Sequence, residues 1–284
     1  MKNLEKIKKK NITTLISSIH LFKDYHNPKN KIYKILKQKF IKYFNDVFKK
    51  GYIKMKFFNF SIFFPYIKMG TINSTHLFGI DEIILFNYYY KNRHKYKNAC
   101  DIGANTGLHS IIMKKCGFKV DAFEPDLEHF KLAKNNFSKN KVKINLVNSA
   151  VSNFSGQIQF TRILNNTTGS YIGNKKKSYG PVKKYKVNVI NSKKLKNKYD
   201  LIKIDAEGSE GDILKNFNKK DFRNTDIVLE ISTPKSKDKI WSIIKKNGLN
   251  VFSQKNSWRL VKNKVDLPSS HREGSVIISK EFII

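Results

Sequence analysis

The sequence of 284 residues predicts an α/β fold in which a mostly parallel sheet is covered by helices on both faces. Three observations lead to this prediction. Strand-like and helix-like stretches alternate from residue 80 onward, a glycine-rich turn joins the first core strand to a helix, and the second core strand ends in an acid. The turn comprises Asp101–Gly107, and the acid is Glu124, 17 residues further along the chain.

Residues 1–79 are expected to form a basic extension ahead of the main domain at residues 80–284. Residues 51–70 are aromatic and β-prone around Asn59 and Pro65, which predicts a hairpin. Residues 1–50 are expected to be helical, with one apolar face that packs on the main domain; a membrane or partner helix is the alternative. That face comprises Ile32, Ile35, Leu36, Phe40, Tyr43, Phe44 and Val47.

The core elements are predicted from hydrophobic periodicity and from capping residues, such as Asp126 before a helix and Gly248 after one. A polar loop at 165–181 lies between two extended segments and is long enough to be a lid or a substrate loop. The predicted helices are 80–90, 108–116, 126–136, 208–217 and 235–247, and the predicted strands are 97–102, 119–123, 142–147, 157–164, 182–190, 200–204 and 226–231, with edge strands at 250–254, 258–261 and 275–279.

The chain is strongly basic, with 56 Lys and Arg against 22 Asp and Glu and a net charge of +34. Such a charge attracts anionic partners over long range and raises the hypothesis of a nucleic-acid substrate. Only five of the basic residues are arginines, however, and arginine is the residue that recognises phosphates through paired, planar contacts. The charge is also spread along the whole chain. Nucleic acid is therefore the weaker hypothesis for the partner.

The sequence shows no export signal and no membrane span. The longest apolar stretch, Phe57–Ile67, has 11 residues and contains Pro65, whereas about 20 apolar residues are needed to cross a bilayer. The N-terminus lacks the apolar core and the cleavage site of a signal peptide. Cys100 and Cys116 lack metal-ligand spacing and are expected to be buried thiols in a reducing compartment. We expect a cytoplasmic protein and leave its oligomeric state open.

The turn at residues 101–107 differs from the dinucleotide-binding pattern because it reads D-x-G-x-N-x-G and lacks the third glycine. Asp101 would repel a pyrophosphate, and a carboxylate there suits a cation such as the amino group and sulfonium of S-adenosylmethionine. Gly103 and Gly107 let the backbone approach a ligand closely, and Glu124 is placed to bind ribose hydroxyls. A turn that binds no ligand is the alternative.

A second dense motif follows the fourth core strand. Lys203, Asp205 and Glu207 stand at alternate positions, which sends their side chains to one face if the strand continues. Because the carboxyl ends of strands line the ligand crevice of an open α/β sheet, we expect them near the glycine turn, together with Glu230. They suit a general base for a hydroxyl, an acidic cluster for a divalent ion, or a structural ion pair. His109 is expected to be structural, with a place in the pocket as the alternative.

These motifs resemble those of the FkbM-type S-adenosylmethionine-dependent methyltransferases. That family shows a DIGAN-x-G turn, A-F-E-P after the second strand, V-N-x-A-V-S after the third, and K-I-D-x-E-G-x-E at the fourth. The matching segments stand here in the same order, as Asp101–Gly107, Ala122–Pro125, Val147–Ser152 and Lys203–Glu210. The resemblance covers residues 80–231 and excludes the first 50 or so residues and the C-terminal tail.

The resemblance implies a class I methyltransferase fold, which is Rossmann-like with a mostly parallel seven-stranded sheet, and S-adenosylmethionine as the cofactor. Members usually methylate a hydroxyl oxygen of a sugar, natural product or other small molecule. Related enzymes often carry an acid after the third strand, and its absence here leaves the adenine contacts open. The implied cofactor-binding residues are Asp101, Gly103, Ala104, Asn105, Gly107, Glu124, Pro125, Asn148, Ser149 and Ala150.

The implied catalytic residues are Asp205 as base or substrate anchor, Glu207 in support, and Lys203 to tune the charge. The sulfonium methyl is already activated, so we expect the protein mainly to align an in-line attack and to exclude water. The sequence contains no D/N-P-P-Y/F/W segment, which favours oxygen over a base amine as the acceptor. No metal site is predicted, and a divalent ion stays an alternative. The competing hypotheses are methylation of RNA or DNA and a non-catalytic nucleotide-binding protein.

Overall fold

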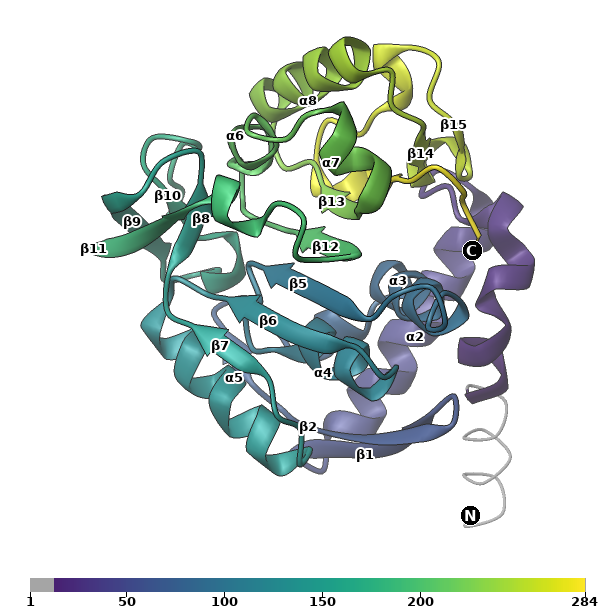
Figure 1. The fold of residues 1–284 in the computed structure, drawn as a ribbon. Coiled ribbons are helices and arrows are strands. Elements are labelled where there is room, and N and C mark those ends of the chain that lie inside the picture. Colours follow the sequence, from purple (N-terminus) through teal and green to yellow (C-terminus); the bar gives the residue numbers. More distant parts are fainter. Residues whose placement is uncertain (1–12, 284) are drawn as a thin grey trace.

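The computed structural model describes residues 13–283, which form a sheet between two layers of helices (Figure 1). The predicted α/β fold is confirmed, and its central sheet is built mainly from the predicted strands. Its strands are β5 (Asn98–Ile102), β6 (Lys119–Phe123), β7 (Asn145–Val147), β12 (Leu201–Ile204), β13 (Asp226–Glu230), β14 (Val251–Ser253), β15 (Arg259–Leu260) and β16 (Ser275–Ile278). The helices around it are α2 (Lys31–Phe48), α3 (Ile80–Lys91), α4 (Leu108–Lys115), α5 (Leu127–Lys139), α6 (Glu210–Leu214), α7 (Lys219–Asn224) and α8 (Pro234–Asn247).

The strand order in the central sheet is β15-β14-β16-β13-β12-β5-β6-β7. The five strands from β13 to β7 run parallel to their neighbours, whereas β16 is antiparallel to both β13 and β14. The expectation of a mostly parallel sheet is confirmed, and the sheet has eight strands instead of seven; the edge strand expected at 258–261 is present as the two-residue β15. β16 was expected at an edge, but it lies inside the sheet because it pairs on both sides.

Alternate residues of the buried strands face different helical layers. In β12, Leu201 packs in the apolar cluster that includes α3 and α4, whereas Ile202 packs in the cluster that includes α6 and α8. The same alternation separates Ala99 from Cys100 in β5. This period of two is typical of a strand buried on both faces. It places α2 to α5 against one face of the sheet and α6 to α8 against the other, as Figure 1 shows.

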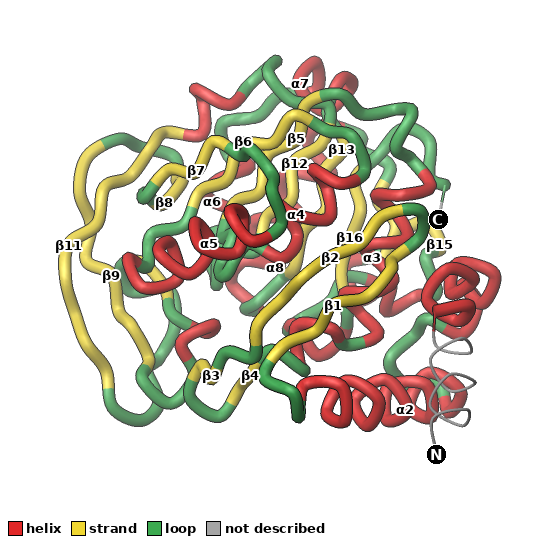
Figure 2. The backbone as a smooth tube through the Cα atoms, turned by 90° about the horizontal axis from the view of Figure 1, so that it is seen from below, coloured by secondary structure: helices red, strands yellow, loops and turns green. Residues whose placement is uncertain are grey.

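A second, four-stranded sheet lies to one side of the central sheet (Figure 2). Its strands β8 (Ala150–Ser152), β9 (Gly156–Ile163), β10 (Tyr171–Ile172) and β11 (Val182–Asn191) pair in the order β10-β9-β11-β8. The two predicted extended segments are confirmed as strands, β9 and β11, and they pair antiparallel. The segment 165–181, expected as a loop, contains β10 and a short 3-10 helix, η3 (Thr167–Gly169). Because β10 pairs with β9, this segment is held against the second sheet.

The N-terminal part of the described chain shares a core with the main domain. The hairpin predicted around Asn59 is confirmed as β1 (Tyr52–Phe57) and β2 (Phe60–Pro65). Helix α2 buries Tyr33, Phe40, Phe44 and Phe48 in the cluster that also contains α3, α4 and sheet residues. The two parts do not have separate apolar cores, and the domain boundary at residue 79 stays a prediction. Residues 1–12 of the predicted helical region lie outside the described residues.

The buried face of α2 is rotated relative to the prediction. Ile32 and Ile35 were expected to be buried but are 41% and 52% exposed. The buried stripe passes instead through Tyr33, whose hydroxyl donates a hydrogen bond to Asp81. The polar end of this aromatic side chain therefore has a partner at the start of α3, which favours its burial over that of Ile32.

The N-terminal and C-terminal parts of the chain are joined by hydrogen bonds around a buried histidine. Trp258 Nε1 donates to His26 Nδ1 over 2.8 Å, and Gln254 Nε2 donates to the His26 carbonyl over 3.2 Å. His26 is 1% exposed, and burial lowers the pKa of its imidazole to about 4. A neutral ring accepts the indole proton, so this contact persists at physiological pH. We call His26, Gln254 and Trp258 the terminal clasp.

Two boundaries differ from the prediction. The helix expected from residue 208 begins only at Glu210, since Glu207 and Gly208 have φ angles of 47° and 100°. The third strand, expected from residue 142, begins at Asn145, after Lys141 adopts a φ of 54°. Helix α7 was not predicted; Asn218 caps it.

None of the described helices is long and apolar enough to cross a bilayer. Cys100 and Cys116 are both free and buried, as expected. Burial raises the pKa of the Cys116 thiol to about 12, so this side chain stays protonated and unreactive.

Candidate functional site

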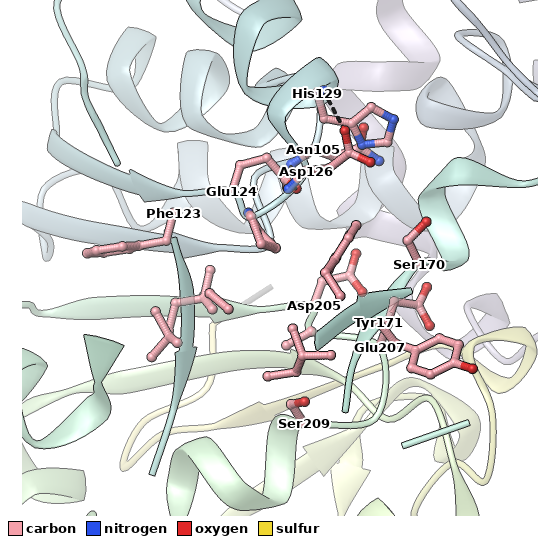
Figure 3. A pocket seen from close by; sticks show the side chains of 18 of the residues that line it. Asn105, Phe123, Glu124, Asp126, His129, Ser170, Tyr171, Asp205, Glu207 and Ser209 are labelled. Carbon is pink, nitrogen blue, oxygen red and sulfur yellow. Dashed lines mark hydrogen bonds between the residues drawn. The ribbon is translucent and has the colours of Figure 1, made fainter. Parts of the chain in front are cut away.

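The carboxyl ends of β5, β6 and β12 open on a cavity of about 590 Å³, a volume that includes its open mouth. We call it the first cavity. Its walls come from the glycine turn, the end of β6, the start of β8, the 165–181 segment and the loop after β12. Figure 3 shows how the side chains of these separate segments converge on it.

Glu124 is fixed at the end of β6 by two backbone amides. Its Oε2 accepts from the amide of Asn105 over 2.6 Å, and its Oε1 accepts from the amide of Asp126 over 2.8 Å. The side chain is 5% exposed and lines the first cavity. Burial raises the pKa of the carboxyl to about 8, although the two amides oppose this shift. Each carboxylate oxygen keeps a further lone pair, so the group can accept hydrogen bonds from hydroxyls in the cavity.

The two glycines of the turn were expected to let the backbone approach a ligand, and in the structure both also make close contacts within the protein. A Cβ added to Gly103, where φ is 77°, would lie 1.8 Å from the carbonyl oxygen of Asp205. A Cβ on Gly107, where φ is 84°, would lie 2.4 Å from the ring of Phe137 in α5. Gly103 therefore lets the turn meet the end of β12. Gly107 makes room for α5 and lines neither of the two cavities described below.

Asp101 was expected to face a ligand cation, but its side chain lies inside the fold. It is 0% exposed, and its Oδ2 accepts from Ser110 Oγ over 2.6 Å. Its Oδ1 lies 3.6 Å from Lys203 Nζ, in the neighbouring strand β12. Asp101 lines neither cavity, so in this conformation its charge balances Lys203 rather than a ligand.

Asn148 also lies outside the cavity walls. Its side-chain amide donates to the carbonyls of Glu124 and Pro125 over 2.8 and 3.2 Å, and so fixes the end of β6. Eight other predicted residues do line the first cavity, and Ala104 lines the second cavity described below. The eight are Gly103, Asn105, Glu124, Pro125, Ser149, Ala150, Asp205 and Glu207.

The sequence analysis did not single out several residues in the wall of the first cavity, most of which come from the second sheet and from the helices. The polar 165–181 loop was recognised as a candidate substrate loop, but the strand pairing that brings it to the cavity carries no local signal. Ser209 falls inside the fourth-strand motif and was not singled out. The missed residues include Phe123, His129, Val151, Phe160, Thr167, Ser170, Tyr171, Ile172 and Ser209.

A second cavity, of about 340 Å³, adjoins the first. The two share Gly103, Asn105 and Asp205 in their walls. The second cavity is also lined by Glu82, at the start of α3, and by His109, in α4. These two cavities therefore meet at the turn after β5 and the end of β12.

His109 lines the second cavity while its ring is fixed by the protein. Its Nε2 lies 2.7 Å from Glu82 Oε2, and its Nδ1 lies 3.0 Å from the hydroxyl of Tyr89. Burial opposes the charge of Glu82, but His109 and Lys203 outweigh it and lower the pKa of this carboxyl. His109 therefore has hydrogen bonds within the protein, as its expected structural role requires, and it also lines a cavity, as the alternative proposed.

Lys203 stands between two carboxylates in the wall of the second cavity. Its Nζ lies 3.6 Å from Asp101 Oδ1 and 3.6 Å from Asp205 Oδ2. Burial opposes its charge, but these two acids outweigh burial and raise the pKa of the ammonium. Asp205 keeps 33% of its side chain exposed, so its carboxylate remains open to a ligand.

Glu230 and Asp205 lie at the carboxyl ends of the neighbouring strands β13 and β12. β12 and β13 pair in parallel up to Ile204 and Leu229, and these two acids are the next residues of the two strands. Burial and then the charge of Asp205 raise the pKa of Glu230 well above its ordinary value. The expectation that Glu230 joins the fourth-strand motif therefore agrees with the electrostatics.

Lys203, Asp205 and Glu207 were expected to share one face only if the strand continued, and this condition is not met because β12 ends at Ile204. Asp205 lines both cavities, Lys203 lines only the second, and Glu207 lines only the first. Glu207 has a φ of 47° and forms an ion pair with Lys176 of the 165–181 segment.

Glu210 is a structural residue. Its carboxylate accepts from the amide of Gly208 over 2.8 Å and from the hydroxyls of Ser232 and Ser236, both over 2.6 Å. Residues 13–283 contain no group of three or more His, Cys, Asp or Glu side chains placed to hold a metal ion.

Comparisons with known proteins identify the family of the main domain. The model of a family described as the methyltransferase FkbM domain matches residues 101–251, which is more than half of the chain. These residues contain the glycine turn, Glu124 and the fourth-strand motif. No curated protein sequence matches the chain.

Several solved structures have a similar fold at low sequence identity. The Pyrococcus abyssi tRNA (uracil-54, C5)-methyltransferase is 12% identical with a TM-score of 0.42, and the match covers 80% of this chain and 44% of that one. The Podospora anserina methyltransferase PaMTH1 is 11% identical with a TM-score of 0.42, covering 70% and 79%. The Geobacter metallireducens precorrin-6y C5,15-methyltransferase is 12% identical with a TM-score of 0.37, covering 70% and 87%. The chain spans less than half the length of the tRNA methyltransferase, and likenesses at this level carry no information about the acceptor.

Proposed function

The chain belongs to the FkbM methyltransferase family, and from this premise we propose that it transfers a methyl group from S-adenosylmethionine to a hydroxyl oxygen of a sugar, glycan or other small molecule. Dependence on S-adenosylmethionine follows from the family. The choice of oxygen, the class of acceptor and the residue roles are our proposal. The observation that carries it is the position of Asp205, whose side chain lines both cavities.

The first cavity suits the nucleoside part of the cofactor. Ribose hydroxyls donate hydrogen bonds, and the buried carboxylate of Glu124 accepts them. The cavity continues past Ser149 and Ala150 along mostly apolar side chains, which suit the faces of a purine.

The shared wall of the two cavities suits the methionine part of the cofactor. Asn105 Oδ1 and Thr106 Oγ1 are buried and have no hydrogen-bond partner among the described residues. Both residues line the second cavity. Buried polar atoms without partners are uncommon in native proteins. An ammonium can donate to the amide oxygen of Asn105, and a carboxylate can accept from the hydroxyl of Thr106.

The chemistry that S-adenosylmethionine supplies when bound is an activated methyl group, and the protein supplies position and a proton acceptor. We assign Asp205 as the base or anchor for the acceptor hydroxyl, because its carboxylate is partly exposed where the two cavities meet. Lys203 Nζ lies 3.6 Å from Asp205 Oδ2 and places a positive charge beside this carboxylate. Proton removal of this kind contributes about 10²–10⁴-fold to a rate. Glu207 points to the first cavity and pairs with Lys176, so we give it no part in this step.

The second cavity favours a neutral, hydroxyl-bearing acceptor over a polyanion. Glu82 and Asp205 present carboxylates that accept hydrogen bonds from hydroxyls, and Lys203 is the cation between Asp205 and Asp101. These carboxylates would repel the phosphates of a nucleic acid. The net charge of +34 is spread over the whole chain and does not alter the acidic wall of this cavity.

The test measures S-adenosylhomocysteine formation with a panel of free sugars, nucleotide sugars and oligosaccharides, and in parallel with total RNA and DNA. We expect turnover with a member of the first panel and an O-methyl product by mass spectrometry and NMR. The Asp205→Asn variant should bind S-adenosylhomocysteine and lose at least 10²-fold in kcat. Asp238→Asn, an exposed carboxylate paired with Lys264, is the matched control and should keep wild-type turnover.

Turnover only with RNA or DNA would overturn the acceptor class and favour the nucleic-acid hypothesis. Cofactor binding without turnover on either panel would favour a non-catalytic protein. Unchanged turnover in Asp205→Asn would remove Asp205 from the chemistry while leaving methyl transfer in place.

A further inference from the structure

We propose that Ser209 recognises the exocyclic amine of the cofactor's adenine, in place of the acid that related enzymes often carry after the third strand. This inference rests on the proposed nucleoside site. It starts from a hydroxyl that the protein itself does not use. Ser209 is 1% exposed, lines the first cavity, and has no hydrogen-bond partner for its Oγ among the described residues.

The position of Ser209 in the sequence makes this free hydroxyl unusual. Ser209 is the N-cap residue of α6, and an N-cap serine normally uses its hydroxyl to accept from an amide of the first helical turn. Here it makes no such bond. The amides of Asp212 and Ile213 bond instead to the carbonyl oxygen of Ser209, each over 3.0 Å. The hydroxyl is therefore left for something inside the cavity.

The surroundings hold Ser209 in a fixed place. The carboxylate of the next residue, Glu210, accepts hydrogen bonds from the Gly208 amide and from the hydroxyls of Ser232 and Ser236. These bonds attach the residues on both sides of Ser209 to the start of α8. A polar group that is held rigidly before the ligand arrives loses little conformational entropy on binding.

The positions of Glu124 and Ser209 in the cavity would place the adenine base near Ser209. Figure 3 shows Glu124 and Ser209 on opposite sides of the cavity. If the ribose hydroxyls bond to Glu124, the base extends away from that residue. The exocyclic amine lies on the edge of adenine that is far from the sugar, and it needs an acceptor when it is buried.

Apolar side chains in the wall of the first cavity recognise the faces of a base and not its edge. Phe123, Val151, Phe160 and Ile172 are each at most 6% exposed and line the cavity. Ser149 also lines the cavity, but its hydroxyl already donates to the Asn148 carbonyl over 2.7 Å. Ser170 is committed as well, since its Oγ donates to the Thr167 carbonyl over 2.8 Å and accepts from the Ile163 amide over 3.1 Å.

The experiment compares two ligands and two proteins by calorimetry. The ligands are S-adenosylhomocysteine and its analogue with unsubstituted purine in place of adenine, which lacks the exocyclic amine. Wild-type protein should bind S-adenosylhomocysteine more tightly than the analogue. In Ser209→Ala this preference should shrink about fivefold, the change expected for one neutral hydrogen bond. Ser209→Ala removes a hydroxyl that has no protein partner, so its unfolding temperature without ligand should match wild type.

Ser170→Ala is the matched control, because it removes another cavity serine whose hydroxyl is already bonded within the protein. It should keep the wild-type preference for the amine. An unchanged preference in Ser209→Ala, or an equal loss for both ligands, overturns the role of Ser209 and leaves the methyltransferase proposal intact. Failure of wild-type protein to bind S-adenosylhomocysteine at millimolar concentration overturns both.

Discussion

The main-chain amide of Asn105 donates a 2.6 Å hydrogen bond to the carboxylate of Glu124. This bond joins the glycine turn after β5 to the acid at the end of β6, so the two most informative parts of the sequence form one unit. Asn105 has a φ of 53°, a left-handed conformation that asparagine tolerates better than most residues. The turn therefore holds Glu124 in place before any ligand arrives.

The pKa of Glu124 predicts a pH dependence of cofactor binding. Burial raises this pKa to about 8, so the side chain is largely protonated at neutral pH in the free protein. Ribose hydroxyls donate to the ionised form, so binding must release a proton below pH 8. The affinity for S-adenosylhomocysteine should rise by up to about tenfold per pH unit between pH 6 and 8 and then level off. Calorimetry in buffers of different ionisation enthalpy measures the released proton directly.

Glu124→Gln should remove this pH dependence and bind the ligand more weakly at pH 8. The same shift affects stability. Because the folded-state pKa lies above the ordinary value of 4.5, the folded protein binds more protons between pH 4.5 and 8, and its stability falls as pH rises through that window. Urea denaturation of Glu124→Gln should lack this fall. An identical pH profile in the two proteins would contradict the assignment.

Gly103 should be intolerant of alanine because of its neighbour rather than its φ angle alone. Gly103→Ala would place a Cβ 1.8 Å from the Asp205 carbonyl, at a φ of 77°. Gly248, at the C-cap of α8, has a φ of 61° and no atom within 4 Å of an added Cβ. Gly248→Ala should cost about 1 kcal/mol for the left-handed backbone alone. Gly103→Ala should cost several kcal/mol, or prevent folding; equal midpoints in urea would contradict this prediction.

Lys203 and Asp101 should behave as a coupled buried pair. Lys203→Met leaves the fully buried Asp101 with its hydrogen bond to Ser110 but without a nearby cation, and should destabilise the protein by about 3 kcal/mol. Adding Asp101→Asn removes the unpaired charge and should recover at least 1 kcal/mol. The double-mutant cycle is measured by chemical denaturation. Strictly additive losses would show that the two residues act independently.

Residues before the hairpin should be required for folding. Removing residues 1–50 deletes Phe40, Phe44 and Phe48, all buried in the cluster shared with α3 and α4. The shortened chain should be insoluble or should unfold without a cooperative transition. Replacing exposed lysines of α2, such as Lys34 and Lys42, by glutamate keeps the core and is the better probe of nucleic-acid affinity. A shortened chain with wild-type thermal stability would contradict this prediction.

The sequence predicted the framework of the fold because its signals are local. Asp126 caps α5 by accepting from the amides of Glu128 and His129, and Gly248 ends α8 in a left-handed conformation, as expected from residue type alone. The turn and Glu124 were found for the same reason. Periodicity also gave the two-sided burial of β5 and β12.

The site was harder to predict from the sequence wherever the direction of a side chain depends on contacts with residues far along the chain. Asp101 was expected to meet a ligand, but a strand residue can face either helical layer, and Lys203 and Ser110 lie on the side it faces. Glu207 departs from strand alternation because it adopts a positive φ that few residues favour. The wall from β9 and β10 depends on pairing across the 165–181 segment, which no local pattern encodes.

The terminal clasp has a consequence for the order of events during synthesis. His26 meets Trp258, which follows it by 232 residues. At about 5–20 residues per second, that interval is on the order of 10 to 50 seconds on the ribosome. Once α3 and α4 have been made, the aromatic side chains of α2 can meet them, but the end of the core near His26 stays open to solvent until Trp258 has been made. The surroundings of His26 are therefore enclosed long after His26 is made, and a nascent-chain chaperone has that interval in which to bind there.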